Sequence, residues 1–179
     1  MTVWIGLLRA VNVSGVNRLP MAAFREMLAG IGLPGARTYI QSGNVVLRSD
    51  LAADALAARI AGGIEAGFGL RAAVLLRSLP QIEAALAENP FPEAEGKPET
   101  LHFFFLGSAL PDVFKASLEA KLAADERLVV RHDLAYLHAP GGVGRSVLAA
   151  ALNRQAAVPV TARNLRTVLA IADLARSLE

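Results

Sequence analysis

Three stretches of the sequence combine arginine with amide or hydroxyl side chains and glycine, which is the chemistry of an anion site. They cover residues 9–18, 41–44 and 140–146, and the stretch 161–164 has the same character. Backbone N–H groups of glycine-rich loops bind anions, and the planar guanidinium fork fits phosphate or carboxylate. If these stretches meet in the fold, they form a pocket of phosphate size. The predicted ligand-binding residues are Arg9, Asn12, Gln41, Ser42, Asn44, Arg145, Ser146, Arg163 and Asn164.

Each stretch also has a purely structural interpretation. Residues 9–18 equally fit a solvated connection, and Ser42-Gly43-Asn44 has the composition of a tight turn, although a turn does not require Gln41. We expect Thr161 to cap the final helix, which would put Arg163 in the first turn, where a positive charge opposes the helix dipole. Arg163 should therefore have a partner elsewhere, either an acidic residue of the protein or a bound anion.

Residues 139–146 match a phosphate-binding P-loop only in part. Against the pattern G-x-x-x-x-G-K-[ST], Ala139 replaces the first glycine and Arg145 replaces the lysine. The stretch also follows the second strand of an expected hairpin, whereas a P-loop connects a strand of a βαβ unit to its helix. The sequence therefore argues against an ATP-hydrolysing P-loop. An anion site and a glycine-rich connection to a helix both stay open.

Several kinds of catalytic and metal site are missing from the sequence. The chain has no cysteine, and His102, His132 and His138 do not have the spacing of a metal motif. No serine lies in a G-x-S-x-G elbow, and no pair of acidic residues stands out as a general acid and base. The sequence therefore predicts no metal and no cofactor, and it leaves open whether the protein is an enzyme.

The composition is that of a soluble globular protein. The 179 residues are 54% hydrophobic and 19% charged, and the net charge of +2 is too small to indicate a nucleic-acid binder. No apolar run approaches the ~18 residues of a membrane helix. The apolar residues 1–10 have no basic region before them and no cleavage site after them, so we expect a first strand and a cytoplasmic protein without membrane attachment.

The stretch 38–47 is the centre of the expected fold, and we interpret it as a β-hairpin that turns at Ser42-Gly43-Asn44. The elements around it follow the order β-α-β-β-α-β, which is the split β-α-β arrangement. We assign the first domain to residues 1–77. Its expected elements are strands at 2–8, 38–41, 45–47 and 72–76 and helices over 20–31 and 50–66.

The second half repeats the order of elements without a repeat in the residues themselves. Three acids, three prolines and a glycine in 89–100 predict an irregular linker, which follows a short helix. The fold class is thus α+β, with two tandem ferredoxin-like (split β-α-β) halves and a C-terminal helix. The connecting helix and linker cover 78–100 and the second half covers 101–179. Its expected elements are strands at 101–106, 128–131 and 134–139, helices over 111–124 and 145–153, an extended segment at 158–160 and a last helix after Thr161.

The sequence resembles a bacterial family known as domain of unknown function 1697. The resemblance rests on residues 7–13 (LLRAVNV), 38–46 (TYIQSGNVV), 89–92 (NPFP), 142–146 (GVGRS) and 161–164 (TARN). It implies a two-part α+β fold with paired ferredoxin-like halves, and it implies no established activity. The family pattern has glycine where Ser14 stands and an aromatic residue where Leu165 stands.

The preferred function is binding of a small ligand that carries phosphate or carboxylate. Arg9, Arg145 and Arg163 would hold its charge, and asparagine and glutamine amides would orient it. A nucleic-acid-binding module is one alternative, and it would need exposed aromatic rings on a sheet. The available rings are those of Trp4, Tyr39, Phe103, Phe104, Phe105 and Tyr136. The other alternative is a structural or oligomer-forming protein without a ligand, and the sequence leaves the oligomeric state open.

Overall fold

The structure is a computed structural model that describes residues 1–13 and 16–179. Ser14 and Gly15 lie outside the described residues, and so does the difference from the family pattern at Ser14. The chain divides into two compact units. Unit 1 consists of Met1–Ala84 together with Ala170–Glu179, and unit 2 consists of Ala85–Leu169. Each unit is described by itself below.

Unit 1 is built around a four-stranded antiparallel sheet with the strand order β2-β3-β1-β4. The central strand β1 pairs with β3 on one side, so that Gly6 lies opposite Val45, and with β4 on the other. The predicted order β-α-β-β-α-β is therefore found here. The elements are β1 (Thr2–Leu8), α1 (Met21–Gly30), β2 (Arg37–Tyr39), β3 (Asn44–Ser49), α2 (Ala53–Phe68) and β4 (Val74–Ser78), followed by the start of α3 (Leu79–Ala87).

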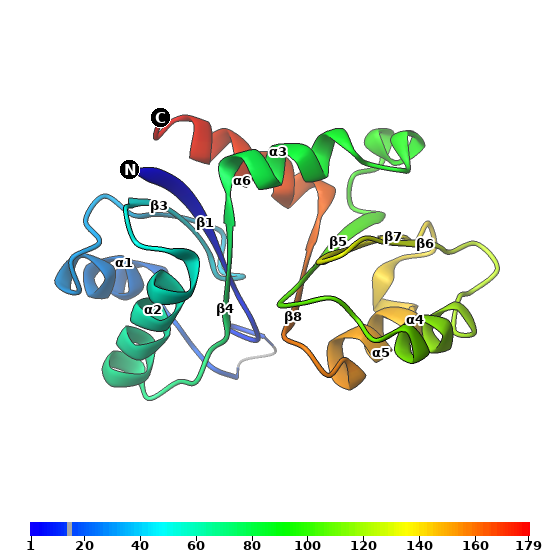
Figure 1. Cartoon of the computed structure of the whole chain (residues 1–179), viewed down its shortest axis with the longest axis horizontal. Helices are drawn as coiled ribbons and strands as arrows, with labels where there is room; N and C mark the ends of the chain where they lie inside the picture. Colours follow the sequence, from blue (N-terminus) through cyan, green and yellow to red (C-terminus); the bar gives the residue numbers. More distant parts are fainter. Residues whose placement is uncertain (14–15) are drawn as a thin grey trace. The chain divides into compact units, whose positions relative to one another are not determined.

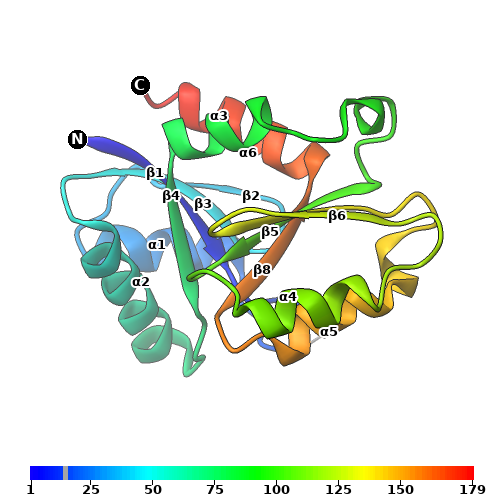
Figure 2. The same cartoon turned by 45° about the vertical axis from the view of Figure 1, so that its right-hand side comes forward.

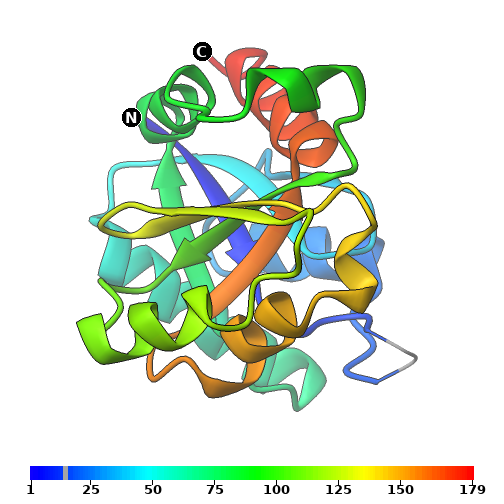
Figure 3. The same cartoon turned by 90° about the vertical axis from the view of Figure 1, so that its right-hand side faces the viewer.

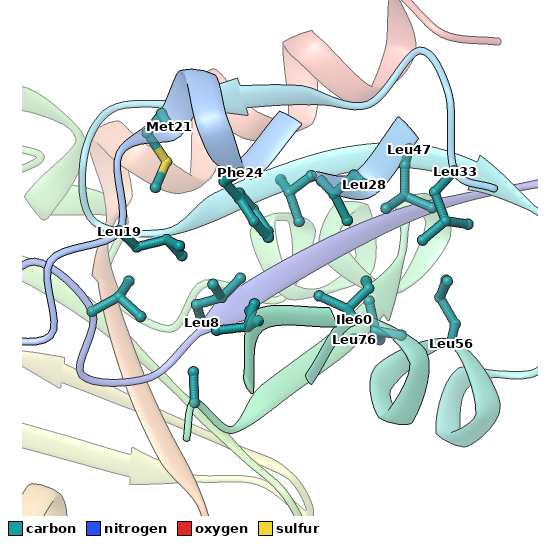
Figure 4. Packing of buried hydrophobic residues seen from close by; sticks show 14 residues of the cluster. Leu8, Leu19, Met21, Phe24, Leu28, Leu33, Leu47, Leu56, Ile60 and Leu76 are labelled. Carbon is teal, nitrogen blue, oxygen red and sulfur yellow. The ribbon is translucent and has the colours of Figure 1, made fainter. Parts of the chain in front are cut away.

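Helices α1 and α2 cover one face of this sheet (Figure 1). Phe24 and Leu28 of α1 lie four residues apart and point toward the sheet, as do Ile60 and Ile64 of α2 (Figure 4 labels Phe24, Leu28 and Ile60). All four side chains are fully buried. Each such side chain contributes about 1.5–3 kcal/mol when it leaves water, so these two stripes fix the helices on the sheet.

Unit 2 has a second four-stranded antiparallel sheet, with the order β6-β7-β5-β8 and β5 in its interior (Figure 2). Helices α4 and α5 pack on one face of it (Figure 3). The α+β class predicted from the sequence is thus confirmed. The elements are β5 (Leu101–Leu106), α4 (Asp112–Glu119), β6 (Arg127–Val130), β7 (Leu134–His138), α5 (Val147–Gln155), β8 (Val160–Asn164) and α6 (Leu165–Arg176), whose last turns belong to unit 1, with short 3-10 helices η1 (Pro92–Gly96) and η2 (Val143–Arg145).

The prediction of a helix that begins at Thr161 is wrong. Residues 160–164 form strand β8, which pairs along its whole length with β5, and Arg163 lies opposite Phe103. The helix begins four residues later, and Asn164 caps it by accepting a hydrogen bond from the backbone N–H of Thr167 at 2.9 Å. Because β8 supplies a fourth strand, unit 2 repeats the whole β-α-β-β-α-β order of unit 1.

The predicted irregular linker over 89–100 is partly regular. Asn89 begins it with an Asx turn, in which its Oδ1 accepts from the Phe91 N–H at 2.9 Å, and η1 follows. Thr100 then accepts a hydrogen bond from the Ala139 N–H, which ties the end of the segment to β7. The proline-rich composition therefore disfavours an α-helix in this segment, but it is compatible with an ordered turn and a 3-10 helix. Across the described residues, no helix is both long enough and apolar enough to cross a bilayer.

Candidate functional site

The β2–β3 connection places three of the predicted polar residues, Gln41, Ser42 and Asn44, at one end of the sheet of unit 1. Strand β2 ends at Tyr39, so the turn consists of residues 40–43 and starts earlier than predicted. Asn44 is fully buried, and its amide donates to the Tyr39 carbonyl oxygen and to Ser42 Oγ, both at 3.0 Å. Asn44 therefore closes the turn from inside, whereas Gln41 is exposed.

Gly43 makes the turn possible because the backbone passes very close to the end of β1. Its φ is +77°, and a Cβ at this position would lie 2.5 Å from Val11 Cγ2 and 2.8 Å from Leu8 Cβ. The Gly43 carbonyl oxygen accepts a hydrogen bond from the Leu8 N–H at 2.8 Å. A side chain would fit neither the dihedral angle nor the space, so only glycine allows this contact.

Asn12 joins the loop after β1 to the hairpin turn. Its Nδ2 donates to the carbonyl oxygens of Leu19, at 2.9 Å, and Gln41, at 2.8 Å, and its Oδ1 accepts from the Leu19 N–H at 2.7 Å. A second asparagine closes the base of the loop, since Asn17 Nδ2 donates to the Ala10 carbonyl oxygen. Asn12 is therefore a residue that positions two loops, and its polar atoms are already engaged.

The backbone of these two loops is strained. Among the described residues, four non-glycine residues have a positive φ, namely Ala10 (57°), Asn12 (53°), Asn17 (53°) and Ile40 (50°). Asparagine tolerates this region, but alanine and especially a β-branched isoleucine do not. Such residues persist only where their surroundings hold them, and they concentrate at functional sites. Here all four fall in the loops that Asn12 connects.

These loops enclose an open hollow with a volume of about 470 Å³. The described residues that line it include one cation and two amide side chains but no acidic residue: Asn12, Val16, Arg18, Pro20 and Gln41. Arg18 is exposed and was not among the residues selected from the sequence, although it lies in the polar stretch 9–18. Arg9, which was selected, is exposed at the start of the same loop. The five residues predicted in this part of the chain thus belong to two loops that touch.

The residues predicted in unit 2 serve mainly as local structure. Ser146 is the N-cap of α5, because its Oγ accepts from the Ala149 N–H at 3.0 Å, and Asn164 caps α6. Both are thus helix caps, which were alternatives in the sequence interpretation. Arg145 is exposed in η2, directly before Ser146.

Arg163 is a buried cation in strand β8. Its Nη1 donates to Thr161 Oγ1 and to the Ala162 carbonyl oxygen, both at 2.8 Å. Burial lowers its pKa to about 10, which still leaves it charged at neutral pH. The interpretation that it opposes a helix dipole is wrong, because it lies in a strand.

A cluster that the sequence analysis missed surrounds Arg127 in unit 2. The Arg127 guanidinium lies 4.8 Å from the centre of the Phe91 ring, forms an ion pair with Glu93, and approaches His138 Nδ1 at 3.2 Å. Burial and the Arg127 charge lower the pKa of His138, so that the neutral imidazole accepts this hydrogen bond. The NPFP stretch can be recognised in the sequence, but the residue of β7 that lies beside it in the cluster cannot be identified from the sequence.

Aromatic rings of unit 2 are not exposed on its sheet. Phe103, Phe104, Phe105 and Tyr136 are all buried. The hydroxyl of Tyr136 donates to the Ala85 carbonyl oxygen at 2.9 Å, and burial raises its pKa to about 12. The nucleic-acid alternative thus cannot draw on these four rings for base stacking. In residues 1–13 and 16–179, no three His, Asp or Glu side chains gather in a way that could hold a metal ion.

Comparison with known families accounts for most of the chain. The pattern of the family described as "Protein of unknown function (DUF1697)" matches residues 1–136. The chain belongs to the DUF1697 family. This match includes both loops around the hollow of unit 1 and confirms the resemblance found in the sequence. No curated protein matches this DUF1697 chain.

A solved structure is similar to the DUF1697 chain over nearly its whole length. It is described as "the structure of conserved bacterial protein SP0830 from Streptococcus pneumoniae". The TM-score is 0.75, the sequence identity is 24%, and the alignment covers 97% of this chain and 98% of that one. At this sequence identity the similarity shows a shared fold alone, and SP0830 is described without an activity.

Proposed function

We propose that this DUF1697 protein binds a small ligand with a phosphate or carboxylate group in the hollow of unit 1. The observation that carries the proposal is the lining, in which Arg18 and the Gln41 amide occur together and the described residues include no acidic side chain. A guanidinium is a strong donor to such anions. The volume of about 470 Å³ is within the range of small-molecule sites.

The residues around the hollow have different roles in this proposal. Arg18 and, from the start of the loop, Arg9 supply positive charge, and Gln41 supplies an adaptable amide. Asn12, Asn44 and Ser42 hold the loops through the hydrogen bonds described above, and so act as positioning residues. The strained backbone at Ile40 supports this division, because strain is kept where the loop geometry matters.

Arg145 and Arg163 are further candidates for anion contacts within unit 2. Arg145 is exposed beside the first turn of α5, where the helix dipole also favours an anion. Arg163 is buried and donates to Thr161 and Ala162, so a ligand would reach it only after a local rearrangement. Of the two, Arg145 is the better target for a test.

We also infer that each unit is a ferredoxin-like half. The order β-α-β-β-α-β in both units, with two helices on one face of an antiparallel four-stranded sheet, supports this assignment. The site proposed above would then lie at the end of the first sheet, in the loops that follow β1 and β2.

A titration with inorganic phosphate and with acetate tests the proposal, followed by 1H–15N correlation NMR at the Gln41 side-chain amide. A hydrogen bond to a charged group contributes ~1.5–3 kcal/mol, so we expect Arg18→Ala to weaken the binding by about 10- to 100-fold. Arg71→Ala is the matched control, because Arg71 is an exposed arginine of the same unit that pairs with Glu65. Equal affinities of the wild type and Arg18→Ala would refute the site.

A further inference from the structure

We infer that the ligand of this hollow carries an apolar group next to its anionic group, so that it is an aryl or alkyl phosphate or carboxylate and not a free inorganic ion. The inference rests on the proposed function and specifies its ligand class. It comes from the apolar residues of the hollow and its two loops, which occur beside the cation and the amides of the lining.

Exposed apolar side chains are concentrated in the two loops that enclose the hollow. Among the described residues, three of the seven large hydrophobic residues that are exposed lie in its two loops: Val13 (57% exposed), Val16 (63%) and Ile40 (51%). Val16 lines the hollow, Ile40 precedes the lining residue Gln41, and Val13 follows Asn12, whose side chain bonds to the Gln41 backbone. Exposed valines are ordinary singly, but a group around a concave site indicates something that covers it.

The backbone conformation of Ile40 also supports the inference of an apolar group in the ligand. Its φ of 50° is unfavourable for a β-branched residue, and the side chain is nevertheless half exposed. Burial in the protein therefore does not account for isoleucine at this position. Contact with an apolar part of a ligand does, because binding would remove the exposed surface from water.

A second hollow in unit 1 shows that this combination is not general. It has a volume of about 450 Å³ and contains two arginines, Arg48 and Arg59. Its lining also contains Asp50, whose carboxylate pairs with the Met1 ammonium at 3.1 Å. The second hollow thus contains an acidic residue as well as cations, whereas the described residues that line the first hollow include Arg18 and Val16 but no acid.

Different residues would bind the anionic group and the apolar group of the proposed ligand, so the two contributions can be tested separately. Inorganic phosphate, phenyl phosphate, acetate and octanoate below its micelle concentration are titrated against the full chain. We expect phenyl phosphate and octanoate to bind about tenfold more tightly than phosphate and acetate, since covering ~50 Å² of apolar surface is sufficient for that gain.

Variants test whether the gain in affinity comes from the apolar residues of the hollow. Val16→Ser should weaken the binding of phenyl phosphate and octanoate more than that of phosphate and acetate, whereas Arg18→Ala should weaken all four ligands. Val113→Ser is the control, because Val113 is an 85% exposed valine in α4 of unit 2. If phosphate binding depends on Arg18 but phenyl phosphate and octanoate bind no more tightly, the inference is overturned and the proposed function stands. If none of the four ligands binds in an Arg18-dependent way, both fall.

An alkyl phosphate can also be presented by a lipid surface, and one further arm separates the two sources. The wild type and Val16→Ser are sedimented with phosphatidylglycerol vesicles and with uncharged phosphatidylcholine vesicles. Val16-dependent binding to the anionic vesicles identifies a lipid headgroup as the source of the amphiphilic anion. Binding of free octanoate or phenyl phosphate without sedimentation identifies a soluble ligand. Absence of both kinds of binding contradicts the inference.

Discussion

The two units of this DUF1697 protein share their order of elements and strands, but they use polar loop residues differently. In unit 1, Asn12 bonds to the backbone of the hairpin turn 29 residues away, and Asn44 closes that turn from inside. In unit 2, Ser146 and Asn164 bond to the helix that starts next to them. The same residue types therefore join distant segments in one unit and end helices in the other. The sequence distance to the hydrogen-bond partner, and not the residue type, distinguishes a residue that links loops from a residue that caps a helix.

The arginines show the same contrast. Arg18 of unit 1 is exposed at a hollow whose described lining residues include no acid, while Arg163 of unit 2 is buried in a strand and donates to its sequence neighbours. Burial lowers the pKa of Arg163, and the exposed guanidinium is the better partner for a ligand from solution. The following experiments would sharpen or break this contrast.

The largest effect is expected for Gly43→Ala in the hairpin turn of unit 1. Alanine at a φ of +77° is strained, and its Cβ would overlap Val11 and Leu8. We expect a loss of about 2–5 kcal/mol in the free energy of unfolding, measured by urea denaturation. Gly62→Ala in α2 is the control, because nothing lies within 4 Å of its added Cβ, and it should gain about 0.5–1 kcal/mol. Similar results for both variants would refute the close contact at Gly43.

A smaller effect should distinguish the two asparagines. Asn12→Ala removes three hydrogen bonds and leaves alanine at positive φ, so we expect a loss of about 2–3 kcal/mol. Asn164→Ala removes only a helix cap and should lose about 1 kcal/mol. Urea denaturation of both variants measures the difference. Equal losses would show that Asn12 is not the link between the two loops.

The smallest effect expected is a pH dependence confined to unit 2, which contains all three histidines. Burial lowers the pKa values of His102 and His138 below their ordinary value of 6.5, and Arg127 lowers that of His138 further. Their contribution to stability is therefore complete above pH 6.5 and is lost as the pH falls from 6.5 through the lowered values. Hydrogen exchange at pH 7.5 and 5.5 should show a larger loss of protection in β5 and β7 than in β1 and β3. His138→Gln should reduce the difference at β7.

Much of the architecture could be predicted from local patterns. The apolar spacing of α1 and α2 and the hairpin around residue 43 are local signals, and they fix unit 1. Strand β8 was missed because Thr161 after Pro159 resembles a helix cap, while its stability as a strand comes from pairing with β5, some sixty residues away. The Asx turn at Asn89 was hidden by a proline-rich composition.

The candidate site was predictable in its composition but not in its geometry. The polar stretches 9–18 and 41–44 were selected for their composition, and whether they meet was left open; in the structure Asn12 and Asn44 bond to the backbone of these loops. The bond from Asn12 to Gln41 spans 29 residues, and no local pattern encodes it. Arg18 was passed over because nothing in the sequence distinguishes it from other exposed arginines; only the hollow does.

The double closure at the base of the loop after β1 has a practical consequence. The Asn12 N–H donates to the Asn17 carbonyl oxygen, and the Asn17 amide returns to Ala10, so the two ends of the segment are pinned independently of what lies between them. A substitution at Val16, which lies between these two asparagines, should therefore change the hollow without opening the base of the loop. The same position would accept a spectroscopic label that reports directly on occupancy beside Arg18.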